Sequence, residues 1–185
     1  MFRIAHLAMA AIAPISLATC LITRSCLKDT KPLAAAAPSI GTPQVADAVL
    51  ATEQAELDQA SLAQERATTL EVRGFAGGVV MQATNAQSRI RSLASAERIA
   101  PLSSDLGEQL RHDSNANHAA LMLDEGLSFD RDYLAKEIKG CEDTLGRLDL
   151  VLLPHVRNDA LRERLNQVMR DEFQARLIEA RNLQQ

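Results

Sequence analysis

Four segments of the chain repeat apolar residues at intervals of three and four, and turn-forming residues separate the segments. This spacing gathers apolar side chains on one side of an α-helix, whereas a half-buried strand needs strict alternation. We expect helices over about residues 44–69, 71–97, 128–152 and 158–180. The sequence holds only 8 Gly, 6 Pro and 3% aromatic residues, too few turn and strand formers for an all-β sandwich or barrel.

The predicted helices begin and end at residues with the matching backbone preferences. Thr42 followed by Pro43 is a helix entry in which the Thr42 hydroxyl is the expected cap, and a Pro in the first turn lacks only an N–H that has no partner within the helix. Ser128 and Asn158 are expected to cap the third and fourth helices, and Pro101 and Pro154 end the segments before them. The pair 77–78 is Gly-Gly, which indicates either close approach of a neighbouring helix or a weaker helix.

These segments predict an all-α fold, a four-helix bundle formed by residues 44–185. Residues 102–126 are less regular and predict short helical pieces closed by Gly126. A spacer of this length can run along the bundle as a crossover between helices two and three, as in ferritin-like folds. An up-down-up-down bundle with an insertion is the alternative.

The N-terminal residues 1–26 have the pattern of an export signal or membrane anchor. Arg3 precedes a stretch, residues 4–23, without Lys, Arg, Asp or Glu. The leader can be processed in three ways: lipidation of Cys20 in Leu17-Ala18-Thr19-Cys20, cleavage within the Ala run 34–37, or retention as an uncleaved anchor. A disordered leader behind a mis-assigned start is the remaining alternative. Residues 27–43, with three Pro and an Ala run, predict a flexible tether.

Charge is distributed unevenly along the chain. Four of the 20 Lys and Arg, but only one of the 24 Asp and Glu, precede residue 40. The remainder therefore carries a formal charge of −7, which excludes a clustered basic face for nucleic acid. We expect an exported protein, periplasmic or membrane-anchored, whose partners are the membrane through its leader and a protein or a second copy of the chain.

Three motifs resemble those of one known family. They are Ala55-Glu56-Leu57-Asp58-Gln59-Ala60-Ser61-Leu62-Ala63, Val72-Arg73-Gly74-Phe75-Ala76 and Phe129-Asp130-Arg131-Asp132-Tyr133-Leu134. In this order they resemble the exported bacterial ferritin-like family of unknown function, domain-of-unknown-function family 4142, over roughly residues 44–183. The resemblance implies a ferritin-like four-helix bundle behind a signal or lipoprotein leader, with no established activity.

The chain departs from the family at its recurrent histidines. Family members carry Asp-His in helix two and one His in each of helices three and four. The corresponding positions here are Gln82-Ala83, Cys141 and the neighbourhood of Glu172-Phe173, while Glu56 is kept. The loss of every recurrent imidazole puts any shared metal or proton chemistry in doubt.

Metal binding therefore has few candidate ligands. A ferritin-like di-metal centre needs Glu-x-x-His on two helices, and no Glu-x-x-His occurs in the sequence. Glu53 and Glu56 share a mostly apolar face, and Glu172 and Cys141 are the other candidates. We therefore expect no metal site: the carboxylates are expected to be paired within the bundle and Cys141 to be a packed, inert thiol, and metal binding by these residues is the alternative. None of His6, His112, His118 and His155 forms a metal-site spacing.

Catalytic signatures are missing from the sequence as well. It contains neither Gly-x-Ser-x-Gly nor a phosphate-binding loop. We expect a non-enzymatic structural or interaction module without a cofactor and without catalytic residues. The competing hypothesis is a metal- or redox-linked stress protein that uses Glu53, Glu56 and Cys141.

Overall fold

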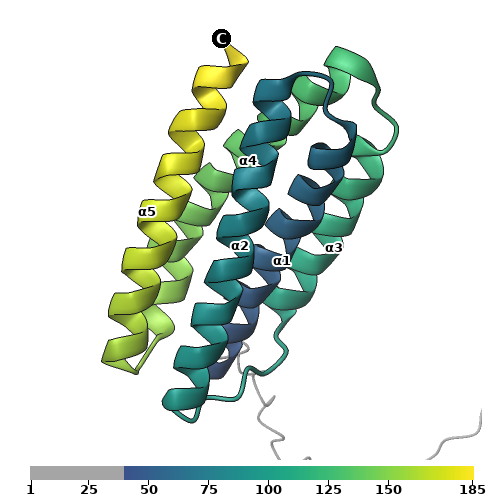
Figure 1. The fold of residues 1–185 in the computed structure, drawn as a ribbon. Coiled ribbons are helices and arrows are strands. Elements are labelled where there is room, and N and C mark those ends of the chain that lie inside the picture. The colour runs from purple at the N-terminus through teal and green to yellow at the C-terminus, as the bar shows by residue number, and fades with distance from the viewer. Residues whose placement is uncertain (1–39) are drawn as a thin grey trace, which may run out of the picture. The chain divides into compact units, whose positions relative to one another are not determined.

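The computed structural model describes residues 40–185, whose regular structure is entirely helical (Figure 1). The five α-helices are α1 (Thr42–Arg66), α2 (Leu70–Ala96), α3 (Asp105–Leu121), α4 (Gly126–Arg147) and α5 (Asp159–Gln184). A π-helical turn, Leu148–Leu152, and a 3₁₀ turn, Leu153–His155, join α4 to α5. The all-α prediction is confirmed. The predicted leader with Cys20, and the tether up to residue 39, lie outside the described residues.

The four long predicted helices correspond to α1, α2, α4 and α5, but the prediction for residues 102–126 is wrong. That segment contains one continuous 17-residue helix, α3. Ser104 caps it by accepting a hydrogen bond from the N–H of Gly107 at 3.0 Å, and two acidic residues in the first turn favour this end of the helix dipole. Its buried face includes Gly107 and Ser114, which are too small and polar to register as an apolar stripe.

Two of the three predicted caps differ in the structure. Gly41, not Thr42, is the N-cap of α1, and the Thr42 hydroxyl accepts a hydrogen bond from the N–H of Arg157 at 3.0 Å instead. α4 begins before Ser128, at Gly126, whose φ of 59° lies in the left-handed region that Gly tolerates. Asn158 caps α5 as predicted, accepting from the N–H of Leu161 at 2.8 Å.

The glycines inside α2 do not mark a close helix approach. A Cβ added at Gly78 would meet no atom within 4 Å. A Cβ at Gly77 would meet only the side-chain amide of Gln64, at 3.3 Å. No neighbouring backbone therefore requires Gly at this pair, and α2 runs through it without interruption from Leu70 to Ala96.

α3 returns the chain along the bundle before α4 begins. α1 and α2 form a hairpin, α3 lies alongside α1, and α4 pairs with α5 (Figure 1). At one end, Arg66 of α1 donates to the carbonyl oxygens of Met122 and Asp124 in the α3–α4 turn, at 2.9 and 2.8 Å. At the other end, the N–H of Leu102 donates to the carbonyl of Pro43 at 3.1 Å. No helix described for residues 40–185 is long and apolar enough to cross a membrane.

The core consists of two apolar clusters separated along the bundle axis. One contains the first buried residues of α1 and α5 and the last of α2 and α4, among them Val49, Ile90, Leu148 and Phe173. The other contains the opposite halves of these helices, among them Ala60, Val79, Leu134 and Ala180. On each helix, the residues between the two clusters include polar side chains, which meet in the middle of the bundle.

Candidate functional site

The middle of the bundle holds a layer of polar side chains, one or two from each of four helices. This polar layer consists of Glu53 and Glu56 from α1, Gln82 from α2, Glu137 from α4 and Arg176 from α5. Four of the five are nearly inaccessible, with exposed fractions of 0% for Glu53, 6% for Glu56, 4% for Glu137 and 1% for Arg176. Side chains of these types are rarely buried unless they are paired.

Helical spacing explains how these side chains reach the interior. The buried residues of α4 include Tyr133, Glu137, Cys141 and Thr144, at intervals of four, four and three. On α5, Arg176 falls between the buried residues Phe173 and Ala180 in the same way. Polar residues therefore occupy positions of the core-facing stripe and are buried with it.

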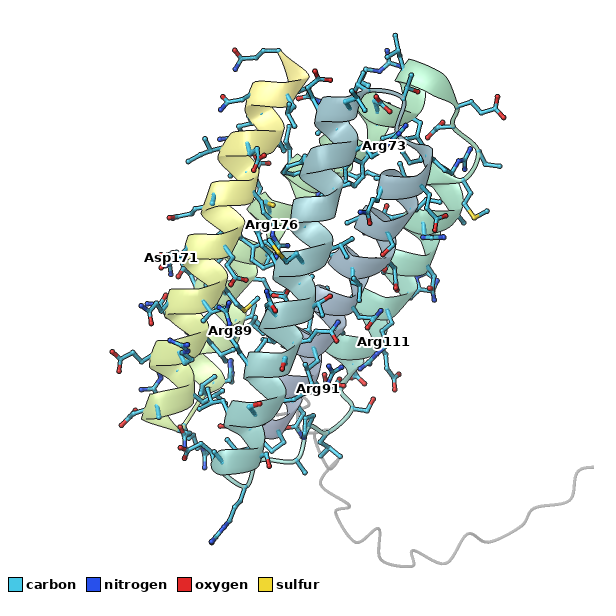
Figure 2. All side chains as sticks on the ribbon, in the orientation of Figure 1. Arg73, Arg89, Arg91, Arg111, Asp171 and Arg176 are labelled. Atoms are coloured by element: carbon cyan, nitrogen blue, oxygen red, sulfur yellow. The ribbon has the colours of Figure 1, made fainter. Side chains whose placement is uncertain are left out.

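Arg176 lies at the centre of the polar layer. Its Nε donates to Gln82 Oε1 at 2.9 Å. Its terminal nitrogens lie 3.5 Å from a Glu56 oxygen, 3.7 Å from Glu53 and 4.0 Å from Glu172. The guanidinium also sits over the Phe173 ring, 4.6 Å from its centroid. One cation thus faces three carboxyl groups, and Figure 2 shows its side chain reaching from α5 towards α2.

Several polar atoms around Arg176 make no hydrogen bond with any side chain or backbone group of the described residues. They are both oxygens of Glu53, Oε2 of Glu56, Oε2 of Glu137, the Tyr133 hydroxyl, Oε2 of Glu172 and both terminal nitrogens of Arg176. Buried polar atoms without partners are costly, about 1–3 kcal/mol each. The contacts of Arg176 with the carboxylates are therefore electrostatic rather than close hydrogen bonds.

Burial shifts the acids of the layer towards their neutral forms. It raises the pKa of Glu53 to about 8, although Arg176 opposes the shift. It also raises the pKa of Glu56 and, more strongly, that of Glu137, where the neighbouring Glu56 adds to the effect. Burial alone would lower the pKa of Arg176, but Glu56 and Glu53 more than offset this and the pKa is raised. The layer therefore holds a firmly charged guanidinium among carboxyl groups that favour protonation.

Cys141 is adjacent to the polar layer but has the character of a packed thiol. It is fully buried. Burial raises the pKa of its thiol well above the usual range, and Glu56 and Glu137 raise it further. A reactive cysteine needs the opposite environment, with cationic groups that stabilise the thiolate. Cys141 and Glu56 nevertheless influence each other electrostatically, so they face the same interior region.

Two surface grooves reach the layer beside α3. One, of about 550 Å³, is lined by Glu56 and Glu137. The other, of about 380 Å³, is lined by Glu56 and Thr144. Gly140 lines both, and a Cβ there would stand 3.5 Å from Glu56 Oε1. The grooves therefore bring solvent up to the side of the layer formed by Glu56 and Glu137.

The candidate ligands named from sequence do converge. Glu53, Glu56 and Glu172 surround Arg176, and Cys141 adjoins them. Across residues 40–185, however, no group of three or more His, Cys, Asp and Glu side chains has an arrangement that could hold a metal ion. His112 and His155 are exposed and His118 is half-buried, and His6 lies outside the described residues.

Sequence reasoning missed Arg176 and Glu137 as members of the site. The available signal was a charged residue at a three-four position of an otherwise apolar stripe, at 176 between 173 and 180 and at 137 between 133 and 141. Gln82, named only as a replaced family position, proves to be the hydrogen-bond acceptor for Arg176 Nε.

The first part of the motif Phe-Asp-x-x-Tyr that opens α4, Phe129 and Asp130, lies apart from the polar layer and is structural, whereas its Tyr133 hydroxyl lies beside Glu137 of the layer. Asp130 accepts hydrogen bonds from the N–H groups of Thr68 and Thr69, at 2.8 and 2.9 Å, and from the Thr69 hydroxyl at 2.8 Å. Phe129 stacks on Tyr133 with 6.5 Å between ring centroids. The motif thus fastens the start of α4 to the α1–α2 turn.

The comparisons with known proteins agree with the resemblance in the motifs. No curated protein and no solved structure matches the chain. One family model matches residues 27–183, and its description is "Domain of unknown function (DUF4142)". The match begins ahead of the helical domain predicted from residue 44, and it covers the whole described bundle apart from its last two residues. The chain belongs to the DUF4142 family.

Proposed function

We propose that this chain is a non-catalytic structural or interaction module of the bacterial cell envelope, with a ferritin-like bundle whose interior cation is Arg176. The observation that carries the proposal is the guanidinium of Arg176 between Glu53, Glu56 and Glu172, at 3.5–4.0 Å. Ferritin-like metal centres place inward carboxylates at this depth around metal ions. Here a side chain of the protein supplies the positive charge among them.

The path of the chain supports the ferritin-like part of the proposal. α3 lies in the long connection between the two helix pairs and runs beside α1 (Figure 1). α4 then begins at the end where α1 finishes, because Arg66 contacts the α3–α4 turn. A crossover between two antiparallel pairs is the connectivity of ferritin-like bundles.

Attachment to the envelope is the part of the proposal that the N-terminal sequence supports. A basic residue followed by an uncharged stretch, residues 4–23, is typical of export. The masses of chains extracted from membranes distinguish three forms: a lipidated Cys20, a cleaved chain that starts near Ser39, and a chain that retains Met1. A chain found only in the cytosol with its leader intact would contradict export.

Metal analysis tests the interior of the bundle. The full chain is incubated with manganese, iron or zinc, freed of excess metal and measured by elemental mass spectrometry, beside a Glu56→Ala variant. We expect less than stoichiometric metal in both proteins. A stoichiometric metal in the wild-type chain that disappears in Glu56→Ala would overturn the proposed role.

The same experiment addresses the competing function, a metal- or redox-linked stress protein. The observation in its favour is the position of Cys141 beside Glu56 and Glu137. The burial that raises its thiol pKa opposes such a role. Alkylation of the folded full chain at neutral pH provides a second measurement, in which fast modification of Cys141 would favour the redox alternative.

A further inference from the structure

A third hollow, which shares no lining residue with the two grooves beside α3, lies near the end of the bundle where α1 begins. It has a volume of about 560 Å³ and lies between α1, the last turns of α2 and the loop that follows. Leu50, Ala94, Ile99 and Pro101 form its apolar part, and the exposed residues Arg91 and Arg98 also line it. None of these residues belongs to the polar layer.

Both arginines lack an acidic partner. Within residues 40–185, no carboxylate oxygen lies within 4 Å of the guanidinium of Arg91 or Arg98. Their neighbour Arg89, by contrast, pairs with Glu172 at 3.1 Å. Figure 2 labels Arg91 on the lower half of α2, away from Arg176. The pocket therefore combines an apolar wall with two positive charges that the fold leaves unpaired.

The backbone at Arg98 gives a second reason to look for a ligand. Arg98 has a φ of 56°, and the N–H of Ile99 donates to the carbonyl of Ala94 at 2.7 Å. With the bond from the Arg98 N–H to Ser95, at 3.1 Å, this is a Schellman motif, whose left-handed position usually holds Gly. The left-handed backbone disfavours any residue other than Gly at this position. A role for the Arg98 side chain would explain why an Arg stands there.

We propose that this pocket binds an anionic phospholipid, with the phosphate held by Arg91 and Arg98 and an acyl chain against Leu50 and Ile99. Guanidinium groups bind phosphate through paired hydrogen bonds, and the apolar wall suits a hydrocarbon chain. The choice of a membrane lipid rests on the proposed envelope attachment. The pocket lies at the end where the chain enters α1, because the loop residue Leu102 bonds to Pro43.

The test measures thermal unfolding of the full chain in a fixed concentration of neutral maltoside detergent. The probes are dihexanoyl phosphatidylglycerol, dihexanoyl phosphatidylcholine and glycerol phosphate. A ligand that binds only the folded chain raises the midpoint, and the stabilisation grows with the logarithm of one plus the ratio of the ligand concentration to its dissociation constant. We expect phosphatidylglycerol to raise the midpoint and the other two probes to leave it unchanged.

Three variants assign the effect to the pocket. Arg91→Gln should weaken the apparent affinity about tenfold or more, the loss expected for a charged hydrogen bond to phosphate. Arg98→Gly should weaken it similarly while raising the midpoint of the lipid-free chain by about 2–4 °C, because Gly relieves the left-handed backbone. Arg157→Gln is the matched control, since Arg157 lies near the same end outside the pocket, and it should leave the affinity unchanged.

Each remaining result would overturn the proposal. Equal stabilisation by phosphatidylcholine would mean that the pocket recognises only the apolar chain, and equal stabilisation by glycerol phosphate would mean a free phosphate site. Equal weakening by Arg157→Gln would mean diffuse attraction of charge. If no probe changes the midpoint, the pocket binds no lipid. This outcome includes the case in which the chain's own N-terminal residues cover the pocket. The lipid measurements are made without added metal, so failure of the proposed interior role, which the metal analysis detects, is a separate result.

Discussion

Asp130 and Glu53 are both buried carboxyl groups, but their surroundings differ. Asp130 is 4% exposed and accepts three hydrogen bonds from the α1–α2 turn, all at 2.8–2.9 Å. Glu53 is fully buried and accepts none within the described residues, with its nearest cation, Arg176, at 3.7 Å. Burial raises the pKa of Glu53 to about 8. A buried carboxylate that accepts short hydrogen bonds holds two parts of a fold together. A buried carboxylate whose only partner is a more distant charge lowers the free energy of unfolding.

The largest expected effect comes from removing the cation of the polar layer. Above about pH 8, where Glu53 is ionised in the folded chain, Arg176→Met leaves Glu53 and Glu56 buried without a counter-charge, and breaking such a pairing costs about 3–5 kcal/mol. Urea unfolding on the alkaline side of this pKa measures the change in the free energy of unfolding. A change below about 1 kcal/mol would show that the carboxyl groups are already neutral in the folded chain and need no cation.

The second-largest effect on the free energy of unfolding is expected at Asp130, the carboxylate whose two oxygens both accept hydrogen bonds. Asp130→Ala removes the acceptor for Thr68 and Thr69, and hydrogen bonds to charged groups contribute about 1.5–3 kcal/mol each. We expect a loss of about 3 kcal/mol in the free energy of unfolding. The paired control is Asp130→Asn, which keeps one acceptor oxygen and should lose less. Equal losses in the two variants would place the role of Asp130 in its charge instead of its bonds.

The pH dependence of stability separates the two carboxylates further. The pKa of Glu53 is raised from 4.5 to about 8 on folding, so the folded chain binds more protons than the unfolded chain between these values. Stability is therefore highest below the unfolded pKa and falls as pH rises towards about 8, by up to about 1.4 kcal/mol per pH unit for this group. Denaturant titrations between pH 4.5 and 8 should show this slope, and Glu53→Gln should flatten it. A slope that persists unchanged in Glu53→Gln would assign it to Glu56 or Glu137.

The smallest effect concerns the hydroxyl beside Glu137. The Tyr133 hydroxyl is buried beside Glu137 but has no partner in good hydrogen-bond geometry among the described residues, so Tyr133→Phe removes a polar atom that gains little on folding. We expect the free energy of unfolding to change by less than about 1 kcal/mol or to increase. Leu134→Ala at the adjacent core position, which removes packed apolar atoms, should cost about 2–5 kcal/mol. A Tyr133→Phe loss as large as that of Leu134→Ala would show that the hydroxyl is bonded in solution.

Much of the helical architecture could be predicted from the sequence, because apolar spacing and breakers are local signals. The repeat of three and four gave α1, α2, α4 and α5, and Asn158 identified the start of α5. α3 was predicted only as short pieces, because its buried face uses Gly107 and Ser114. Thr42 was misassigned as a cap, because its hydroxyl bonds to Arg157, 115 residues away.

The sequence by itself determined the all-α fold, the membership of the family through its ordered motifs, and the inward position of Glu53 and Glu56. Only the tertiary structure decided which charge those carboxylates face. Arg176 is remote from Glu53 and Glu56 in the chain, and it meets them only because α5 packs against α2 and α4 and points this side chain across the core towards α1. Helical periodicity specifies which side of a helix is buried, but the partner of a buried charge depends on how the helices are arranged around one another.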